Sequence, residues 1–327
     1  MNPTPSPGRV TLAYGQVLLA GALWATSGPL SIALFRMGVP ATSVALLRPA
    51  VGVCFLGLFL AYLRARRPVE PVEVSGPRRG GRALAGMLLL GGVIVGIFQL
   101  SYQMSTDAVG VPATVALLYL APALVIAASV KVFGERLTLA KGTLALASIA
   151  GVWMTVFGTR GVDVDLTLRG ILWGCVCGGG YAAYTLFGKW YGREHGPLLP
   201  LFWSTLGGTI LLGAVWWARE VPVVLPPTIL AWVVLGALGL FTMAVAALLL
   251  FDALRILDAG RASIGTTIEP FVATLLAWSF LGQTLTPLGQ IGLVVLVVGV
   301  AGAYGMRISD APAPPGPGTE PGRPLLR

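Results

Sequence analysis

Charge is scarce in this sequence. Asp, Glu, Lys and Arg make up 11% of its 327 residues, whereas they make up about 25% of an ordinary soluble domain. Hydrophobic residues account for 56% of the chain, and the mean hydropathy is +0.83. One globular core of this size cannot bury that much apolar surface. The composition therefore excludes a soluble enzyme and a disordered chain, and it indicates a protein that lies mostly in lipid.

Histidine and cysteine are scarce too. His195 is the single histidine, and the three cysteines, Cys54, Cys175 and Cys177, lie in apolar stretches. These residues supply neither a disulfide framework nor a metal-binding cluster, and a Ser-His-Asp site lacks material. The sequence has no Walker motif, which argues against direct use of ATP. We therefore expect no catalytic residue, no metal and no cofactor.

What the sequence does contain is long apolar runs. A helix needs about 20 apolar residues to cross a bilayer core about 30 Å thick. Runs of this length lie at 11–34, 41–63, 83–104, 110–130, 139–159, 168–188, 199–218, 229–250, 260–281 and 285–306. They are continuous, whereas a membrane β-barrel has alternating segments of about 10 residues. The sequence thus predicts an all-α integral membrane protein with ten transmembrane helices, spans 1 to 10.

Lys and Arg are distributed unevenly between the ends of these spans. Of the 22, 17 fall at the termini or in connections that follow even-numbered spans, four fall on the other side, and Arg48 lies within span 2. Positive charge marks the cytoplasmic side, so both termini are predicted to be cytoplasmic in a multi-pass protein of the cytoplasmic membrane. This orientation accounts for the net charge of +9, and no nucleic-acid partner is expected. The tails, 1–10 and 307–327, are expected to be flexible.

The two halves of the sequence are similar to each other. Pro122 and Gly134 are each followed 148 residues later by the same residue type, and Gly21 recurs after 157 residues. Each half, 11–159 and 168–306, contains five predicted spans. Because five is odd, the second copy enters the membrane from the opposite side. The halves are therefore predicted to be inverted repeats, an arrangement that suits alternating access.

Short motifs in both halves resemble those of a known family. Residues 21–28 read GALWATSG, 47–48 LR, 118–122 LYLAP, 134–138 GERLT, 268–270 IEP and 281–286 LGQTLT. Their order and spacing resemble the EamA family of the drug/metabolite transporter superfamily over nearly the whole chain. The resemblance implies a ten-span carrier, often an exporter of amino acids or related metabolites, with spans 5 and 10 outside a central cavity. The sequence departs from the family pattern at Gln283, where the first copy has Glu135.

Four prolines lie well inside predicted spans, away from their ends: Pro29, Pro49, Pro122 and Pro270. Each removes an N–H and leaves the carbonyl four residues earlier without its helical donor. In a bilayer that carbonyl needs a partner from protein or a wet cavity. A packing kink and a hinge are equally compatible with such a proline. The match between Pro122 and Pro270 favours hinges at these two positions.

Two charged residues lie well inside the spans, away from their ends. Glu269 is the only acid in the middle of a span, and Arg48 lies in span 2. A charge at this depth costs at least about 2.5 kcal/mol, which makes a functional role the default. Glu269 could couple protons, pair with a substrate ammonium or form a structural ion pair with Arg48. Arg48 could instead extend its side chain to the outer interface.

Polar and aromatic side chains within the spans are candidates for a cavity. Gln99, Tyr102 and Gln103 share one helical face, and two amides are unfavourable against lipid. The other candidates are Trp24, Ser27, Tyr119, Tyr181, Tyr184 and Thr266. Such groups suit an amphipathic metabolite, because aromatic walls combine with a few hydrogen-bonding groups. Taken singly, each aromatic is more often a packing residue.

These features favour a secondary transporter, with export as the expected direction, that moves a small polar or amphipathic metabolite such as an amino acid by alternating access. A substrate gradient or protons would drive it. A channel is the alternative, although the sequence has no ring of like charge and no filter-like run. A membrane-embedded enzyme would need paired acids or a nucleophile with its base, and the spans offer only Glu269. The expected partners are the lipid bilayer and a small molecule, and the oligomeric state stays open.

Overall fold

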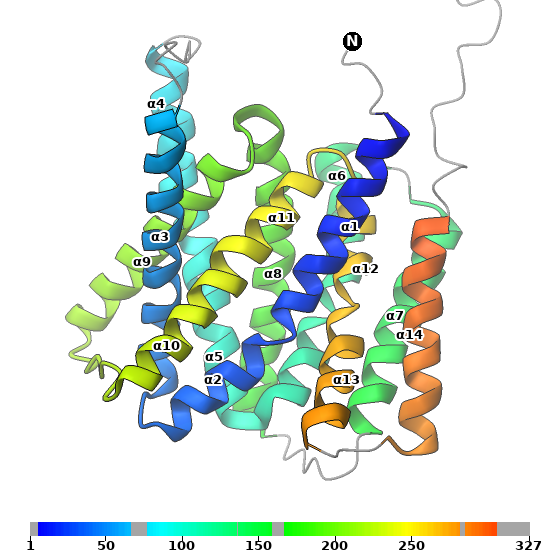
Figure 1. Cartoon of the computed structure of the whole chain (residues 1–327). Coiled ribbons are helices and arrows are strands. Elements are labelled where there is room, and N and C mark those ends of the chain that lie inside the picture. Colours follow the sequence, from blue (N-terminus) through cyan, green and yellow to red (C-terminus); the bar gives the residue numbers. More distant parts are fainter. Residues whose placement is uncertain (1–5, 67–76, 136, 159–166, 282–284, 306–327) are drawn as a thin grey trace, which may run out of the picture.

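The computed structural model describes residues 6–66, 77–135, 137–158, 167–281 and 285–305. Within these ranges the chain is helical, as the sequence predicts, and the helices pack into one bundle (Figure 1). In chain order the segments are α1 (Pro7–Trp24), α2 (Ser27–Arg36), α3 (Ala41–Arg66), α4 (Pro77–Ala85), the π-helical η1 (Gly86–Leu90), α5 (Gly91–Leu118), α6 (Ala121–Phe133), α7 (Leu139–Phe157), α8 (Leu168–His195), α9 (Leu198–Ala218), α10 (Ile229–Ala237), the π-helical η2 (Leu238–Val245), α11 (Ala246–Ala253), α12 (Ala259–Thr266), α13 (Glu269–Leu281) and α14 (Pro287–Gly305).

Several of these segments are suited to a membrane. Six apolar helical stretches among the described residues are long enough to cross one: Gly8–Arg36, Ala41–Arg66, Gly81–Phe133, Leu139–Phe157, Leu198–Ala218 and Ile229–Ala253. The third contains 53 residues. Because about 20 residues are sufficient for one crossing, this stretch has the length for two. A shorter apolar helix covers Pro287–Ala303. The structure therefore supports a multi-pass membrane protein.

Gly110 turns the chain in the middle of the longest stretch. Its φ of 78° and ψ of 168° are a conformation that a residue with a Cβ rarely adopts. In Figure 1 α5 leads down from α4, and α6 lies back toward the side where α1 begins. The predicted spans 83–104 and 110–130 are thus joined at a glycine turn rather than by a longer irregular loop.

Helix breaks lie beside three of the four prolines. Pro29, Pro122 and Pro270 lie in the first turns of α2, α6 and α13, respectively. A missing N–H leaves no gap in the hydrogen-bond ladder there. Two residues separate each of these helices from the helix before it. Pro49, in contrast, lies inside the continuous α3. The hinge roles of Pro122 and Pro270 stay predictions, and both prolines lie directly at a break.

α7 and α14, which correspond to predicted spans 5 and 10, pack against each other at one edge of the bundle (Figure 1). Glycines bring their backbones close. A Cβ at Gly151 would lie 2.5 Å from the backbone N of Leu296, and one at Gly292 would lie 2.5 Å from the backbone N of Thr155. Close backbone approach of this kind is a principal way in which helices associate within a bilayer.

The helix ends define two faces of the bundle. We call the face where α1 begins the N-terminal face; α3, α8, α11 and α14 end at this face and α12 begins there (Figure 1). The opposite face contains the end of α9 and the start of α10 (Figure 1). Helix ends therefore gather at two opposite faces of the bundle, and the orientation of these faces in the membrane stays a prediction.

Candidate functional site

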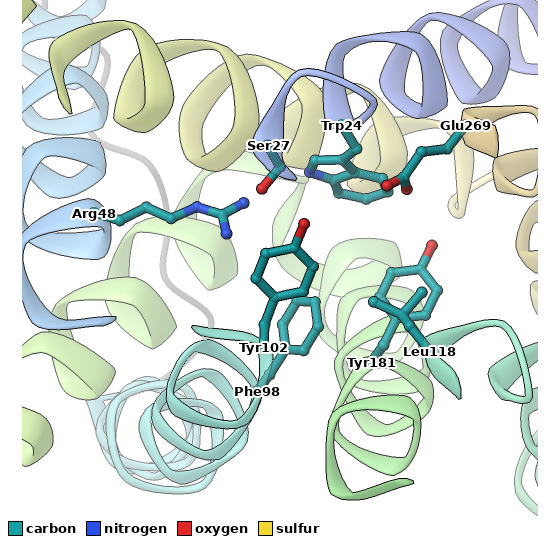
Figure 2. Close-up of a pocket in the computed structure, with 8 residues that line it drawn as sticks. All are labelled: Trp24, Ser27, Arg48, Phe98, Tyr102, Leu118, Tyr181 and Glu269. Carbon is teal, nitrogen blue, oxygen red and sulfur yellow. The ribbon is translucent and has the colours of Figure 1, made fainter. Parts of the chain in front are cut away.

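A pocket lies inside the bundle where the broken helices meet. Eight residues line it: Trp24, Ser27, Arg48, Phe98, Tyr102, Leu118, Tyr181 and Glu269. The empty volume among them is about 330 Å³, which includes open space at the mouth, so the enclosed part is smaller than the cavities of about 300–1,000 Å³ that hold drug-sized ligands. α1 ends, α2 begins and α13 begins at lining residues. Figure 2 shows Arg48 and Glu269 at opposite ends of the pocket, with Tyr102 and Tyr181 between them.

Glu269 is the first residue of α13, and a tyrosine hydroxyl from another helix break contacts its carboxylate. Its side chain is buried, and its Oε2 lies 2.6 Å from the hydroxyl of Tyr119. The same hydroxyl lies 2.8 Å from the carbonyl oxygen of Thr266, and Tyr181 donates a hydrogen bond of 2.9 Å to Thr266 Oγ1. Thr266 is the last residue of α12, and the last carbonyls of a helix have no intrahelical donor. Tyr119 therefore offers a partner to a carbonyl at the break before α13.

Arg48 also points inward. Its Nε donates a hydrogen bond of 3.1 Å to Thr242 Oγ1 in η2, and its guanidinium carbon lies 5.4 Å from the centre of the Tyr102 ring. Thr242 also accepts a hydrogen bond of 2.8 Å from Trp24 Nε1 at its carbonyl oxygen. The Arg48 side chain is 4% exposed, so it does not extend to the outer interface. Among the described residues, no ion pair joins it to Glu269, and the two charges have different partners.

Aromatic rings form the wall between the two charges. The rings of Trp24 and Tyr181 meet edge to face, with centres 5.8 Å apart and planes at 86°. Phe98 lies against Tyr181 with ring centres 5.6 Å apart. Trp24 and Tyr181 also hold equivalent positions in the two repeats, because each follows by three residues one of the matching glycines Gly21 and Gly178. The two halves therefore contribute matching aromatic side chains to one contact.

The structure brings together most of the residues that the sequence predicts for the cavity. Six of them line the pocket: Trp24, Ser27, Arg48, Tyr102, Tyr181 and Glu269. Tyr119 and Thr266 adjoin it through the hydrogen bonds described above. Tyr184 is buried next to the pocket wall, with its ring centre 5.9 Å from that of Phe98 and 4.8 Å from that of Phe251. The pocket roles of these residues stay predictions, but their placement is compatible with them.

Gln99 and Gln103 do not line the pocket, although both are buried. Gln99 Nε2 lies 2.9 Å from the sulfur of Met243. The two polar atoms of the Gln103 side chain have no hydrogen-bond partner among the described residues. Both amides therefore face protein instead of lipid, and their predicted role in a cavity stays a prediction.

Three residues at the site gave little or no signal in the sequence. Phe98 and Leu118 line the pocket, and each is one apolar residue within an apolar run. Thr242 contacts both Arg48 and Trp24. A hydroxyl in the middle of span 8 could have drawn attention to it, and so could its place in a π-helical segment, since such segments recur at functional sites.

The arrangement can bind but has few means to catalyse. A cation at one end and a carboxylate at the other, with rings between them, can hold a small molecule that carries both charges. In the described part of the chain, no group of three or more His, Cys, Asp or Glu could hold a metal ion.

The comparison with protein families decides what kind of protein this is. Residues 11–157 and residues 168–305 each match the EamA-like transporter family. The chain belongs to this family. The two matches cover both halves of the EamA protein, so the resemblance predicted from its short motifs is confirmed.

Individual relatives agree with this assignment. An uncharacterized transporter of Archaeoglobus fulgidus is 29% identical over 256 residues, which cover 78% of this chain and 86% of that protein. The uncharacterized transporter YwfM of Bacillus subtilis is 26% identical over 153 residues, 47% of this chain and 50% of that protein. A solved crystal structure matches 94% of this chain and 100% of its own chain, with a TM-score of 0.70 at 19% identity, and it supports the fold alone. Family and relatives together identify the EamA protein as a membrane transporter.

Proposed function

We propose that this EamA protein is a secondary carrier that exports a small amphipathic metabolite, such as an amino acid, across the cytoplasmic membrane by alternating access. The observation that carries the proposal is the position of the pocket, which lies inside the bundle at the breaks between helices. Carriers commonly bind substrate where discontinuous helices meet near the bilayer midplane. The chain contains two segments that each match the family, and such repeats are the basis of alternating access in many carriers.

The proposed topology has ten spans. Two helices joined at a break form one span in three cases: α1 with α2, α10 with α11, and α12 with α13. The stretch from α4 to α6 forms two spans that meet at Gly110. The helices α3, α7, α8, α9 and α14 form one span each. The excess of Lys and Arg assigns the N-terminal face to the cytoplasm. Both termini are then cytoplasmic, and the two copies have opposite orientations in the membrane.

The ends of the pocket suggest which substrates fit. Arg48 can bind a carboxylate through two parallel hydrogen bonds, and Glu269 can accept hydrogen bonds from an ammonium group. The rings of Trp24, Tyr102 and Tyr181 between them suit an apolar middle portion. A zwitterion with an apolar side chain combines these three features, which supports an amino-acid-like substrate.

Buried polar atoms suggest a route between the pocket and the opposite face. The hydroxyl oxygens of Ser27 and Ser31 on α2 and of Thr106 on α5 are buried and have no hydrogen-bond partner among the described residues. The side-chain amide of Gln103 on α5 is also buried without a hydrogen-bond partner among the described residues. α2 packs against α5. Natural proteins leave few buried polar groups unpaired. These four residues therefore support a polar path for the substrate along the α2–α5 contact.

The test is counterflow in liposomes. Purified protein is reconstituted with an unlabelled amino acid inside, and uptake of the labelled compound is followed across a panel of amino acids, their amine analogues and their carboxylic acid analogues. Saturable counterflow of zwitterions supports the carrier. Electrical conductance without saturation would favour the channel, and a covalently changed product would favour an enzyme. Liposomes without protein give the background rate.

A further inference from the structure

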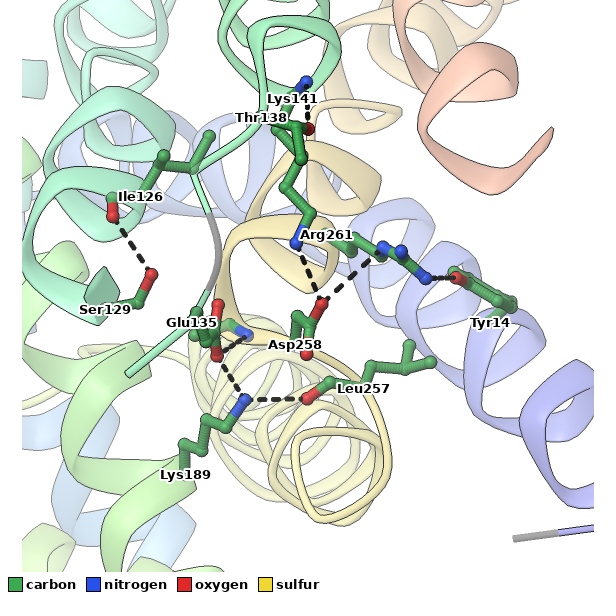
Figure 3. A network of polar contacts seen from close by, with 11 residues as sticks. Tyr14, Ile126, Ser129, Glu135, Thr138, Lys141, Lys189, Leu257, Asp258 and Arg261 are labelled. Atoms are coloured by element: carbon green, nitrogen blue, oxygen red, sulfur yellow. Dashed lines mark hydrogen bonds and ion pairs between the residues drawn. The ribbon is translucent and has the colours of Figure 1, made fainter. Parts of the chain in front are cut away.

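Charged side chains gather where α12 begins, at the N-terminal face (Figure 3). Glu135, in the connection between α6 and α7, accepts a hydrogen bond from Lys189 of α8 and one of 2.9 Å from the backbone N–H of Ala259, the first residue of α12. Lys189 also donates to the carbonyl oxygen of Leu257 at 3.1 Å, and its side chain is 0% exposed. Glu135 thus caps the N-terminus of α12, where negative charge is favourable, and it compensates a fully buried cation.

A second set of contacts surrounds Asp258, the residue that precedes α12. Its Oδ2 lies 3.1 Å from Lys141 Nζ of α7 and 3.7 Å from Arg261 Nε of α12. Arg261 in turn lies 3.5 Å from the hydroxyl of Tyr14 on α1. Glu135 and Lys141 belong to the first repeat, whereas α12 belongs to the second. The two sets of ion pairs therefore fasten the start of α12 to the other half of the protein.

α12 connects these charges with the pocket. It has eight residues, and all of them are buried. Its last residue, Thr266, has hydrogen-bonding contacts with Tyr119 and Tyr181, which adjoin the pocket. Charged contacts thus hold one end of this short helix and pocket contacts hold the other. A helix with fixed contacts at both ends can shift as a unit when either set of contacts changes.

Tightly packed side chains separate the pocket from the N-terminal face. Leu250, Phe251 and Leu254, at the end of α11, are 0% exposed. The ring of Phe251 lies 4.8 Å from that of Tyr184 and 6.4 Å from that of Phe187, centre to centre. These side chains fill the space between α8 and α11, and all eight residues of α12 are buried as well.

The second copy lacks these charges at the matching positions. The offset of 148 residues applies around α12, because the breaks after Leu118 and Thr266 also match. The counterparts of Glu135, Lys141, Lys189 and Asp258 are all uncharged: Gln283, which lies outside the described residues, Gly289, Ile32 and Gly110. The inversion of the repeats assigns these four positions to the opposite face. At these four pairs of positions, charge therefore occurs only on the N-terminal side.

We propose that α12 is the gate of the N-terminal face and that the Glu135–Lys189 and Lys141–Asp258 pairs are its latch. Opening this face breaks both pairs and moves α12 away from α7 and α8. A substrate that changes the contacts of Thr266 acts on the latch through α12. Because the opposite face has no equivalent charges, the unloaded protein rests with the N-terminal face closed. The proposal rests on the carrier function proposed above.

The test measures access to α12 directly and does not depend on transport. Ser263, in α12, is 0% exposed, and Ser263→Cys is introduced into protein whose three native cysteines have been replaced. An impermeant maleimide is added to vesicles on the side that presents the N-terminal face. Labelling is expected to be slow in this parent protein. It should become at least about tenfold faster when the latch is removed, which corresponds to a shift of about 1.4 kcal/mol in the closed–open equilibrium.

The latch is removed with the double variant Glu135→Gln/Lys189→Met. Neutralising both partners avoids leaving one buried charge uncompensated, and Gln can still accept the N–H of Ala259. The matched control is Arg255→Gln, which removes an ion pair of 3.0 Å with Asp252 on the same face but within one short segment. The control is expected to label at the parent rate.

A second cysteine position separates gating from unfolding. Ser148, in the α7–α14 contact, is 0% exposed and lies away from α12's charged end. Ser148→Cys should stay unlabelled in the double variant. An unchanged rate at Ser263→Cys would overturn the latch, and so would an equal gain at both positions, because the pairs would then hold the whole fold. Absence of counterflow in the wild-type protein would instead count against the carrier function and is measured separately.

Discussion

The hydroxyl of Tyr119 has one hydrogen and two acceptors within reach, Glu269 Oε2 at 2.6 Å and the carbonyl oxygen of Thr266 at 2.8 Å. When Glu269 is ionised, the hydrogen goes to the carboxylate, because charge-assisted bonds are the stronger ones. When Glu269 is protonated, the acid can donate to the phenol oxygen, and the hydrogen of Tyr119 turns to Thr266. One phenol thus links the protonation state of the pocket acid to the last residue of α12.

Glu269→Gln tests whether this acid couples protons to transport. Gln keeps the shape and most of the hydrogen bonding but cannot ionise. We expect counterflow to lose its dependence on pH between 5 and 8, with a melting temperature in detergent close to that of the wild type. If Glu269 instead stabilised Arg48, the variant would melt earlier, and Arg48→Gln would partly restore the stability. Wild-type transport at every pH, together with wild-type stability, would refute both roles.

Arg48→Gln tests the recognition of a carboxylate. Loss of a charged hydrogen-bonded contact of about 1.5–3 kcal/mol should raise the half-saturating substrate concentration about 10- to 100-fold. The partner of Arg48, Thr242 Oγ1, also donates to the carbonyl oxygen of Leu238 at 2.5 Å, so the hydroxyl keeps a partner in the variant. Counterflow of an amine analogue without the carboxylate is the control. Equal loss for the zwitterion and the amine would contradict the assignment.

Asp258 provides a prediction about pH at the latch. Burial raises the pKa of its carboxyl, but the charges of Lys141, Lys189 and Arg261 lower it more, so that the pKa lies below the ordinary value of 3.8. A lowered pKa gives stability that is complete above the unfolded value and is lost only as the pH falls through the folded one. The difference in melting temperature between wild type and Asp258→Asn should therefore be constant from pH 8 to pH 5. A difference that vanishes toward pH 5 would contradict this sign.

At the scale of elements, the α7–α14 contact is built from backbone more than from side chains. Gly151 and Gly292 lie where a Cβ would approach the partner helix within 2.5 Å. Neither helix contributes a lining residue to the pocket. We infer that this pair supports the bundle at its edge while the broken helices carry the site.

Gly151→Ala should weaken this contact, because the new methyl group meets the backbone N of Leu296, which cannot rotate away. Gly142→Ala on the same helix is the matched control, since nothing lies within 4 Å of a Cβ there. The first variant should lower the melting temperature in detergent by several degrees, whereas the second should leave it unchanged or raise it, because Ala favours helix. Equal melting temperatures for the two variants would contradict the contact.

The elements themselves were largely predictable from the sequence. Long apolar runs require helices in lipid, and Pro122 and Pro270 marked two of the breaks. The direct turn at Gly110 was not predictable, since most glycines in membrane helices serve packing. In the sequence, Lys189 contributes only to the positive charge at one end of a span. The structure buries its side chain against Glu135. Its burial depends on how α8 meets the start of α12, which a single sequence does not specify.

At the scale of the whole molecule, charge determines the orientation, and labelling of intact cells can test it. In protein without native cysteines, Ser75→Cys, outside the described residues, should resist an impermeant reagent added from outside. Leu225→Cys, between α9 and α10 at the opposite face and 57% exposed, should react. The physical reason is the excess of Lys and Arg at the N-terminal face. Labelling at Ser75→Cys alone would reverse the topology.

The charged residues of the candidate site were predictable from the sequence, because burying a charge costs free energy. The apolar residues were not, because burying them is favourable anywhere in the protein. Arg48 and Glu269 were visible because charge within an apolar run needs a reason. Phe98 and Leu118 were not visible, because lining a pocket and packing in a core require the same residue types. The sequence also left a pair between Arg48 and Glu269 open, and the structure gives the two charges separate partners. Which residues meet is a property of the whole bundle.

The meeting of Trp24 with Tyr181 has a geometric consequence. In the inverted-repeat arrangement that we propose, the two rings hold equivalent positions and touch edge to face, so the axis that relates the copies would pass between them. A solute bound beside this axis would meet one copy's ring on one flank and the other copy's ring on the other, whichever side it came from. In the proposed cycle it would leave on the far side without tumbling, so that the helices rearrange and the cargo does not.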